Sequence, residues 1–233
     1  MRKKHYIKLI VFDMAGTTVN ENNVVYKTLQ LAINKLGHDV TLHDVLLNGG
    51  GKEKLQAIRD IMRPAYNSSD SLEKDAQAAF SDFLILLKDA YENLTVTTYE
   101  GTVALFEYLR KNGVKTALNT GYNTKTALSL LEKLNWGEGQ TFDALVTADD
   151  VDRSRPAPDM ILLAMEKCGI SNPKEVAKVG DSMVDIEEGK AAHCGLTFGV
   201  TTGAQTADQL NAARPDFIID SLPELKSIIA IRG

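Results

Sequence analysis

The stretch Lys8-Leu-Ile-Val-Phe-Asp13, followed at once by Met-Ala-Gly-Thr-Thr18, decides the fold of this chain. A short apolar run of this kind is typical of a strand that is buried on both faces of a parallel sheet. The run ends on a carboxylate and a polar turn. Because functional groups of an open parallel sheet gather beyond the carboxyl ends of its strands, we expect Asp13 to lie at a functional site.

Strands and helices alternate in the second part of the chain. After Tyr99-Glu-Gly101, apolar runs of strand length are separated by segments with helical spacing. The predicted strands are 114–118, 142–146, 176–179, 196–200 and 217–219, and the predicted helices are 103–109, 124–134, 159–167, 184–192 and 222–229. This alternation predicts an α/β fold, a Rossmann-like three-layer core in which helices cover both faces of a parallel sheet.

The segment between these two parts has helical spacing and almost no strand signal. Apolar stripes run through residues 25–36, 55–62 and 72–87; Gly37 closes the first and Pro64 follows the second. We therefore predict an all-helical domain at 20–98, inserted into a core formed by 1–19 and 99–233. The hinges would lie near Asn20 and Tyr99.

The composition argues against several classes of protein. With 44% hydrophobic and 24% charged residues among 233, the chain resembles a soluble globular protein. A net charge of −5 gives no basic surface for nucleic acid. The apolar run Ile7–Phe12 is too short for a signal sequence or a membrane span, so we expect no membrane contact and a cytoplasmic location. Cys168 and Cys194 fit reduced structural thiols.

Four strand ends carry side chains of complementary chemistry. They are Asp13, Thr120, Arg155, and Asp181 with Asp185. Each alone has an ordinary explanation, such as a helix cap or a turn. Together they supply what phosphoryl transfer requires: carboxylates for Mg²⁺, a nucleophile that can form an acyl phosphate, and a hydroxyl and a guanidinium for the phosphoryl oxygens. The predicted partner is a small phosphorylated or phosphonate substrate.

These motifs resemble those of the haloacid dehalogenase superfamily. The matching stretches, in the family's order, are Val11-Phe-Asp13-Met-Ala-Gly-Thr17, Leu118-Asn-Thr120-Gly, Arg155-Pro-Ala-Pro and Val179-Gly-Asp181-Ser-Met-Val-Asp185. The likeness covers essentially the whole chain. The helical insertion resembles the type-one cap of that superfamily, and the resemblance implies a hydrolase that uses Mg²⁺.

The resemblance also implies individual roles around the metal. Asp13 would be the nucleophile and a metal ligand. The backbone carbonyl of Ala15 and the carboxylate of Asp181 would be further ligands. Asp185 would orient metal-bound water or pair with the arginine of the third motif, and Ser182 would support the site or simply cap a helix.

The resemblance assigns the phosphoryl oxygens to Thr120 and Arg155, and it places Gly121 and Tyr122 beside the substrate. One expected group is missing. Phosphatases of this superfamily usually carry an aspartate two residues after the nucleophile, which protonates the leaving group. This chain has Ala15 there, so an ordinary monoesterase should be slow.

The stretch Asp13-Met-Ala-Gly-Thr-Thr18 resembles phosphonoacetaldehyde hydrolase and its relatives, in which such an acid is less important. In those enzymes a cap lysine forms a Schiff base with the aldehyde, and the leaving group departs as an enamine. The matching candidate is Lys52, in Gly49-Gly-Gly-Lys52. Lys52 could instead be a simple cation or a solvated surface residue. Asn48 and Leu55 depart from the family's methionine and histidine, which leaves the substrate open.

Two alternative functions remain at this stage. One is hydrolysis of phosphate monoesters of the phosphoglycolate phosphatase type, with water or a substrate group replacing the missing acid. The other is a catalytically impaired protein that only binds a phosphorylated ligand. The chain could act as a monomer or a homodimer.

Overall fold

The computed structural model describes residues 6–50, 52–92 and 94–230. Its centre is a parallel sheet of six strands in the order β5-β4-β1-β6-β7-β8. The strands are β1 (Leu9–Asp13), β4 (Lys115–Thr120), β5 (Ala144–Thr147), β6 (Val176–Gly180), β7 (Leu196–Val200) and β8 (Phe217–Ile219). All six predicted strands are present, shifted by at most two residues at either end. The chain leaves β1 toward β4 on one side and returns to β6 on the other, so a topological switch point lies beside β1.

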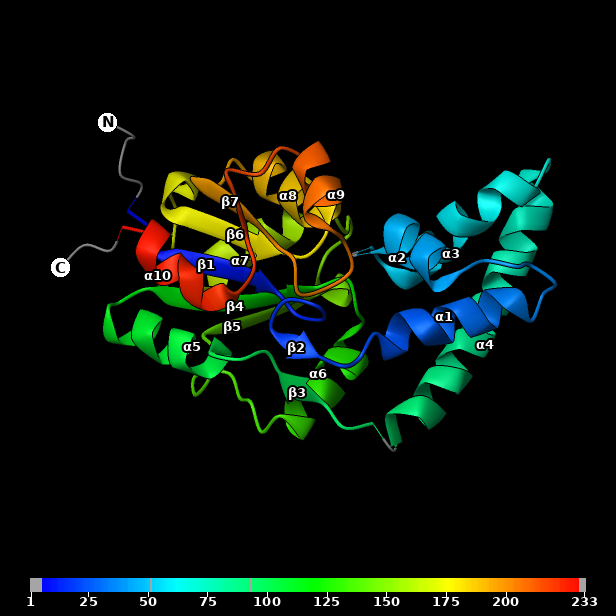
Figure 1. Cartoon of the computed structure of the whole chain (residues 1–233), viewed down its shortest axis with the longest axis horizontal. Coiled ribbons are helices and arrows are strands. Elements are labelled where there is room, and N and C mark those ends of the chain that lie inside the picture. The colour runs from blue at the N-terminus through cyan, green and yellow to red at the C-terminus, as the bar shows by residue number, and fades with distance from the viewer. Residues whose placement is uncertain (1–5, 51, 93, 231–233) are drawn as a thin grey trace.

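Helices cover both faces of this sheet (Figure 1). Successive side chains of β1 point to opposite faces: Ile10 and Phe12 join one apolar cluster, while Leu9 and Val11 join the other. On the first face lie α5 (Thr102–Lys111), α6 (Thr124–Lys133) and α10 (Leu225–Ile228), and on the second lie α7 (Asp159–Lys167), α8 (Met183–Ala191) and α9 (Ala207–Ala212). The predicted three-layer α/β core is confirmed. Helix α9 was not predicted.

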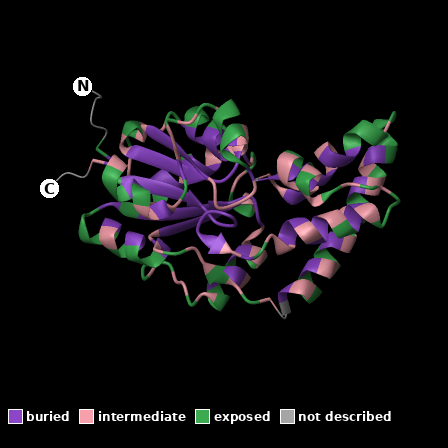
Figure 2. Ribbon diagram, in the orientation of Figure 1, coloured by how far each residue is buried: buried purple, intermediate pink, exposed green. Residues whose placement is uncertain are grey.

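Four further helices gather at one end of the molecule, beyond the edge of the sheet (Figure 1). They are α1 (Val24–Asn34), α2 (Leu42–Gly49), α3 (Lys54–Met62) and α4 (Ser69–Glu92), with a short 3-10 turn at Arg63–Ala65. Their apolar faces turn inward (Figure 2). Helix α2 was not among the predicted apolar stripes, but Thr41 and Asp44 form a capping box at its start. No helix in the described part of the chain is long and apolar enough to cross a membrane.

The two connections between the sheet and the helical block lie side by side. They form a small antiparallel ribbon of β2 (Val19–Asn20) and β3 (Thr97–Thr98). Val19 pairs with Thr98, and Asn20 pairs with Thr97. The Thr98 hydroxyl also donates to the backbone carbonyl of Thr18 across 2.8 Å. This ribbon coincides with the expected hinges, although the division into two domains at 19/20 and 98/99 stays a prediction.

Candidate active site

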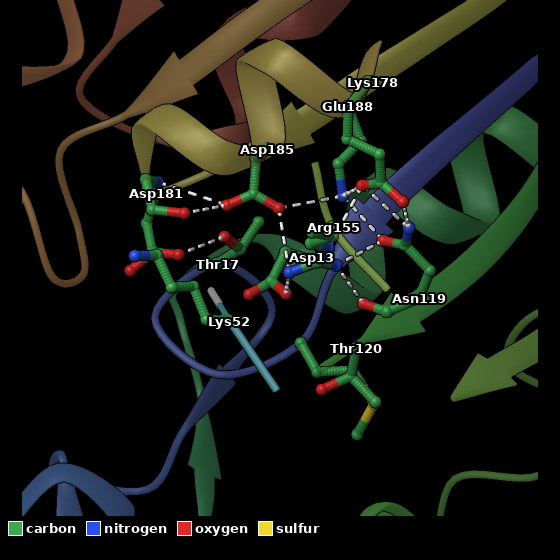
Figure 3. A network of polar contacts seen from close by, with 12 residues as sticks. Asp13, Thr17, Lys52, Asn119, Thr120, Arg155, Lys178, Asp181, Asp185 and Glu188 are labelled. Carbon is green, nitrogen blue, oxygen red and sulfur yellow. Dashed lines mark hydrogen bonds and ion pairs between the residues drawn. The ribbon is translucent and has the colours of Figure 1, made fainter. Parts of the chain in front are cut away.

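The predicted polar side chains meet at the carboxyl edge of the sheet (Figure 3). Asp13 is the last residue of β1 and lies opposite Asn119 of β4 in the strand register. Thr120 ends β4, and Asp181 follows β6 directly. Asp13, Thr120 and Asp181 are all buried. Residues far apart in the sequence therefore converge on one site beside the switch point.

Arg155 fixes the position of the Asp13 carboxylate. Its Nη1 atom lies 2.6 Å from Oδ1 of Asp13 and 3.0 Å from Oδ1 of Asp185. Its Nη2 atom donates to the backbone oxygen of Asn119 across 2.8 Å. The guanidinium thus spans two strand ends, with its fixed fork of donors directed at the proposed nucleophile.

A second buried layer lies behind these residues, and sequence reasoning did not assign it. The Asn119 amide nitrogen donates to Glu188 across 2.8 Å, and its amide oxygen accepts from Lys178 across 2.6 Å. Lys178 Nζ also lies 3.0 Å from Oδ1 of Asp185. Glu188 Oε2 in turn accepts from Nε of Arg155 across 3.1 Å. This network ties the arginine to three elements of the core.

The network holds Asp185 in its charged form. Burial alone would raise the pKa of Asp185, but Arg155 and Lys178 outweigh it and lower that pKa. The second oxygen of Asp185 accepts from the backbone N–H of Ser182 at 3.2 Å and from its hydroxyl at 2.5 Å. Ser182 and Asp185 therefore form the capping box of α8. The same contacts of Ser182 fit both of its expected roles, support for the site and the helix cap.

Asp13 and Asp181 carry charge that the protein does not fully compensate. Burial raises the pKa of Asp13, and the contact with Arg155 only partly offsets this. Burial, and then the neighbouring Asp13 and Asp185, raise the pKa of Asp181 well above its usual value. A pair of buried carboxylates that repel each other is the electrostatic setting that a divalent cation relieves.

The backbone approaches the carboxylate of Asp181 closely. Gly16 and Gly203 lie against its carboxylate, and a side chain at either position would collide with it. Oδ2 of Asp181 accepts from the backbone N–H of Ala204 across 2.6 Å. Within the described ranges, no three His, Cys, Asp or Glu side chains form a metal-binding group. The expected donor set is instead two carboxylates with the carbonyl of Ala15, and such a mixed oxygen set suits Mg²⁺, which retains waters.

The residues expected beside the substrate lie directly after β4. The hydroxyl of Thr120 accepts from the backbone N–H of Tyr122 across 3.1 Å, which forms a tight turn. Gly121 and Tyr122 line a cavity of about 210 Å³ together with residues of the helical block. Tyr122 is buried, and its hydroxyl has no hydrogen-bond partner among the described residues.

Two lysines lie near this site, the expected Lys52 and, in addition, Lys54. Nζ of Lys52 donates to Oδ2 of Asp60 across 2.6 Å. Lys54 is the first residue of α3 and is buried. Nζ of Lys54 donates to the backbone oxygen of Lys52 across 2.6 Å. It also lies 4.9 Å from the ring centroid of Tyr26 and 5.0 Å from that of Tyr122. Lys52 is therefore engaged within the helical block, while Lys54 lines the cavity.

Burial changes the acid–base properties of this lysine. It lowers the pKa of Lys54 to about 8, against the opposing effect of Asp13 and Glu53. Close by, Glu21 is buried at the start of the helical block, and Oε2 accepts from the backbone N–H of Val25 across 3.1 Å. Burial raises the pKa of Glu21 to about 7. Both groups can therefore change their charge near neutral pH.

The missed residues did leave signals in the sequence. Lys54 falls three and four residues before Ala57 and Ile58, on the same buried stripe of α3. Asn119 and Lys178 interrupt apolar strands, and a polar group at a buried strand position requires a partner. Glu188 lies one helical turn after Asp185. Helical and strand periodicity, applied to polar residues, would have singled out this set.

Known proteins with similar sequences are hydrolases, in agreement with the geometry of the site. The sequence profile of the haloacid dehalogenase-like hydrolases matches residues 7–193. The chain belongs to this family. It is therefore an enzyme, a hydrolase of the haloacid dehalogenase superfamily.

The similar proteins in this family carry names for different activities. The chain is 33% identical over 192 residues to a bifunctional phosphonoacetaldehyde hydrolase/aminoethylphosphonate transaminase of Clostridioides difficile, covering 78% of this chain and 30% of that protein. It is 28% identical to a phosphoglycolate phosphatase of Vibrio parahaemolyticus, covering 97% of each chain. A solved phosphonoacetaldehyde hydrolase-like protein from Oleispira antarctica shares the fold, with a TM-score of 0.81, 22% identity, and coverage of 98% of this chain and 94% of that one.

Proposed function

We propose that this hydrolase transfers the phosphoryl group of a small phosphorylated or phosphonate substrate to Asp13 and then to water. The supporting observation is the contact of 2.6 Å between Nη1 of Arg155 and Oδ1 of Asp13, next to the buried carboxylate of Asp181. A carboxylate held this way can attack phosphorus in line with the leaving group.

The residues of this chain would share the work as follows. Oδ of Asp13 forms a bond to phosphorus while the bond to the leaving group breaks. Arg155 and the hydroxyl of Thr120 bind the phosphoryl oxygens, where charge is concentrated. Asp13, Asp181 and the carbonyl of Ala15 would hold Mg²⁺, which offsets repulsion between the attacking carboxylate and the anionic substrate. Water then attacks phosphorus and releases the Asp13 carboxylate and inorganic phosphate.

Ala15 cannot protonate the leaving group. Lys54 could make this proton unnecessary through a Schiff base of the phosphonoacetaldehyde hydrolase type. Its amine, with a pKa lowered to about 8, can condense with an aldehyde and expel water. As the carbon–phosphorus bond breaks, its electrons move into the protonated imine and form an enamine. Protonation and hydrolysis of the enamine return the aldehyde and the free lysine. We assign this role to Lys54 instead of Lys52, because Lys54 lines the cavity beside Tyr122.

Release of inorganic phosphate tests the first proposal. Native protein with Mg²⁺ should release phosphate from a panel of small phosphate esters and phosphonates, and Asp13→Asn should abolish this release. Equal rates for the native protein and the variant would reject the role of Asp13.

Borohydride reduction in the presence of phosphonoacetaldehyde tests the second proposal. A covalent adduct should form on the native protein and on Lys52→Arg, but not on Lys54→Arg. Phosphate release from ordinary monoesters without any adduct would favour the alternative, a phosphatase of the phosphoglycolate type. Closure of the helical block over the bound substrate is part of the same proposal.

A further inference from the structure

The cavity beside Lys54 has an apolar wall that the proposed chemistry does not use. Val25 of α1 forms part of it, and α4 supplies the rest through Phe80, Phe83, Leu84 and Leu87. The core supplies the opposite side through the loop after β4. The space lies where the helical block faces the carboxyl edge of the sheet.

This cavity is adjacent to the phosphoryl site. Gly121 and Tyr122 line it, and they directly follow Thr120. Lys54 lines it as well and is close enough to Asp13 for the carboxylate to act on its charge. In an in-line displacement the leaving group departs on the side opposite the nucleophile. A leaving group that departs from Asp13 toward the helical block therefore enters this cavity.

The size of the cavity indicates the size of its ligand. Its volume is about 210 Å³, whereas an apolar cavity of about 150 Å³ is enough to hold benzene. A two-carbon group would leave most of the wall formed by Phe80, Phe83 and Leu87 in contact with water. A ring-sized apolar group would cover that wall and gain the corresponding hydrophobic free energy.

The charges around the cavity indicate a neutral ligand. Besides Lys54, the charged residues described as lining it are Glu53 and Asp149. Backbone N–H groups hold both carboxylates in place, Leu55 for Glu53 at 2.9 Å and Thr124 for Asp149 at 2.8 Å. A second anionic group on the substrate would meet two fixed carboxylates and a lysine already shared with Asp13.

We propose that this cavity is the leaving-group subsite, and that it takes an uncharged apolar group about the size of a benzene ring. The buried Tyr122 hydroxyl, which lacks a partner among the described residues, would donate to the oxygen at the near end of that group. The inference rests on one part of the proposed function, phosphoryl transfer to Asp13, and goes beyond it, because it gives the leaving group an apolar ring and excludes a carboxylate and a second phosphate from the subsite.

Three phosphate esters of similar leaving-group reactivity test the inference: ethyl phosphate, benzyl phosphate and 4-carboxybenzyl phosphate. The value of kcat/KM for benzyl phosphate should exceed that for ethyl phosphate by about tenfold or more, as expected for apolar groups in a fitted pocket. The carboxylate on the ring should reverse most of that gain. Equal values for ethyl and benzyl phosphate, or a preference for the carboxylated ester, would overturn the inference and leave the proposed function intact.

Two substitutions on α4 provide a matched comparison. Leu84→Trp fills the cavity and should lower the benzyl-to-ethyl ratio of kcat/KM by about tenfold. Ile85→Trp, one residue along, adds the same bulk at a position that is 63% exposed and should leave the ratio unchanged. An equal effect of both variants would assign the change to general disturbance of the helix and refute the subsite.

Binding separates failure of the subsite from failure of the proposed function. Benzylphosphonate and ethylphosphonate carry no scissile ester, so calorimetric titration with Mg²⁺ reports on the pocket without catalysis. Tighter binding of benzylphosphonate, weakened by Leu84→Trp, supports the subsite even if no ester is hydrolysed. Equal affinities for the two phosphonates count against it, whatever the activity.

Discussion

Nζ of Lys54 donates to the backbone oxygen of Lys52 across 2.6 Å, so the two lysines belong to one turn but serve different partners. The amine of Lys52 is held by Asp60. The amine of Lys54 lies over the rings of Tyr26 and Tyr122, at the cavity. The sequence singled out Lys52 alone, whereas in the structure Lys52 is paired with Asp60 and Lys54 is the more deeply buried of the two.

Removing each amine in turn should separate these roles. Lys54→Met should lower kcat/KM by about 100-fold or more, the loss expected for a charged or covalent group at a reacting centre. Lys52→Met removes only a partly buried ion pair within the helical block and should have a small effect on kcat/KM. Steady-state kinetics on both variants provide the measurement. The opposite pattern would restore Lys52 as the catalytic lysine.

The pH dependence of the same reaction tests the form in which Lys54 works. The pKa of Lys54 is lowered to about 8, mainly by burial. Condensation with an aldehyde requires the neutral amine, so kcat/KM for an aldehyde substrate should rise with pH and level off above about 8. A rate that falls through this region would show that the lysine acts as a cation.

Mg²⁺ should stabilise the fold through Asp181. The carboxylates of Asp13 and Asp181 repel each other in a buried site, so Asp181→Asn should raise the Tm when chelator is present. The native protein should gain Tm on addition of Mg²⁺, by mass action, and the variant should lose most of that gain. Thermal denaturation with Mg²⁺ and with EDTA is the required experiment; an unchanged response of the variant to Mg²⁺ would rule out Asp181 as a ligand.

Glu21 should make the stability of the native protein depend on pH. Burial raises its pKa from 4.5 to about 7, so between these values the folded state binds the proton more tightly than the unfolded state. Its unfavourable contribution is absent below the lower value, grows as pH rises, and is complete above the higher one. Glu21→Gln should therefore raise the Tm above pH 7 and change it little below pH 4.5. The same shift in Tm at both extremes would contradict this account.

The buried network behind the site should be sensitive to loss of a single charge. Lys178 is fully buried between Asp185, Glu188 and Asn119. Lys178→Met removes one of the two buried cations, Lys178 and Arg155, that contact Asp185 and Glu188. The loss should lower the free energy of unfolding by about 3–5 kcal/mol.

Lys8 provides the matched control for this network. It pairs with Glu175 at 2.9 Å, but its side chain is 47% exposed. Lys8→Met should lower the free energy of unfolding by less than about 1 kcal/mol. Equal midpoints for the two variants in urea would show that the network contributes no more than a surface pair.

The parts of the fold that sequence predicts are those where one local pattern decides the outcome. The apolar runs that end at Asp13 and Asp181 place both carboxylates correctly, because parallel strands present their carboxyl ends at one edge. Helix α2 was missed because its start depends on the capping box of Thr41 and Asp44 rather than on a long apolar stripe. Lys54 was passed over because burial of a lysine depends on side chains from other elements, here Tyr26 and Tyr122.

The ribbon of β2 and β3 has a consequence for how the helical block can move. Two independent tethers would permit twisting as well as tilting. Val19 pairs with Thr98 and Asn20 with Thr97, so the two connecting segments are joined and move together. A rotation of the helical block about one axis is the movement that keeps these backbone hydrogen bonds intact. A substrate would then enter from the side of the domain interface that opens most, which is the side away from the β2–β3 ribbon.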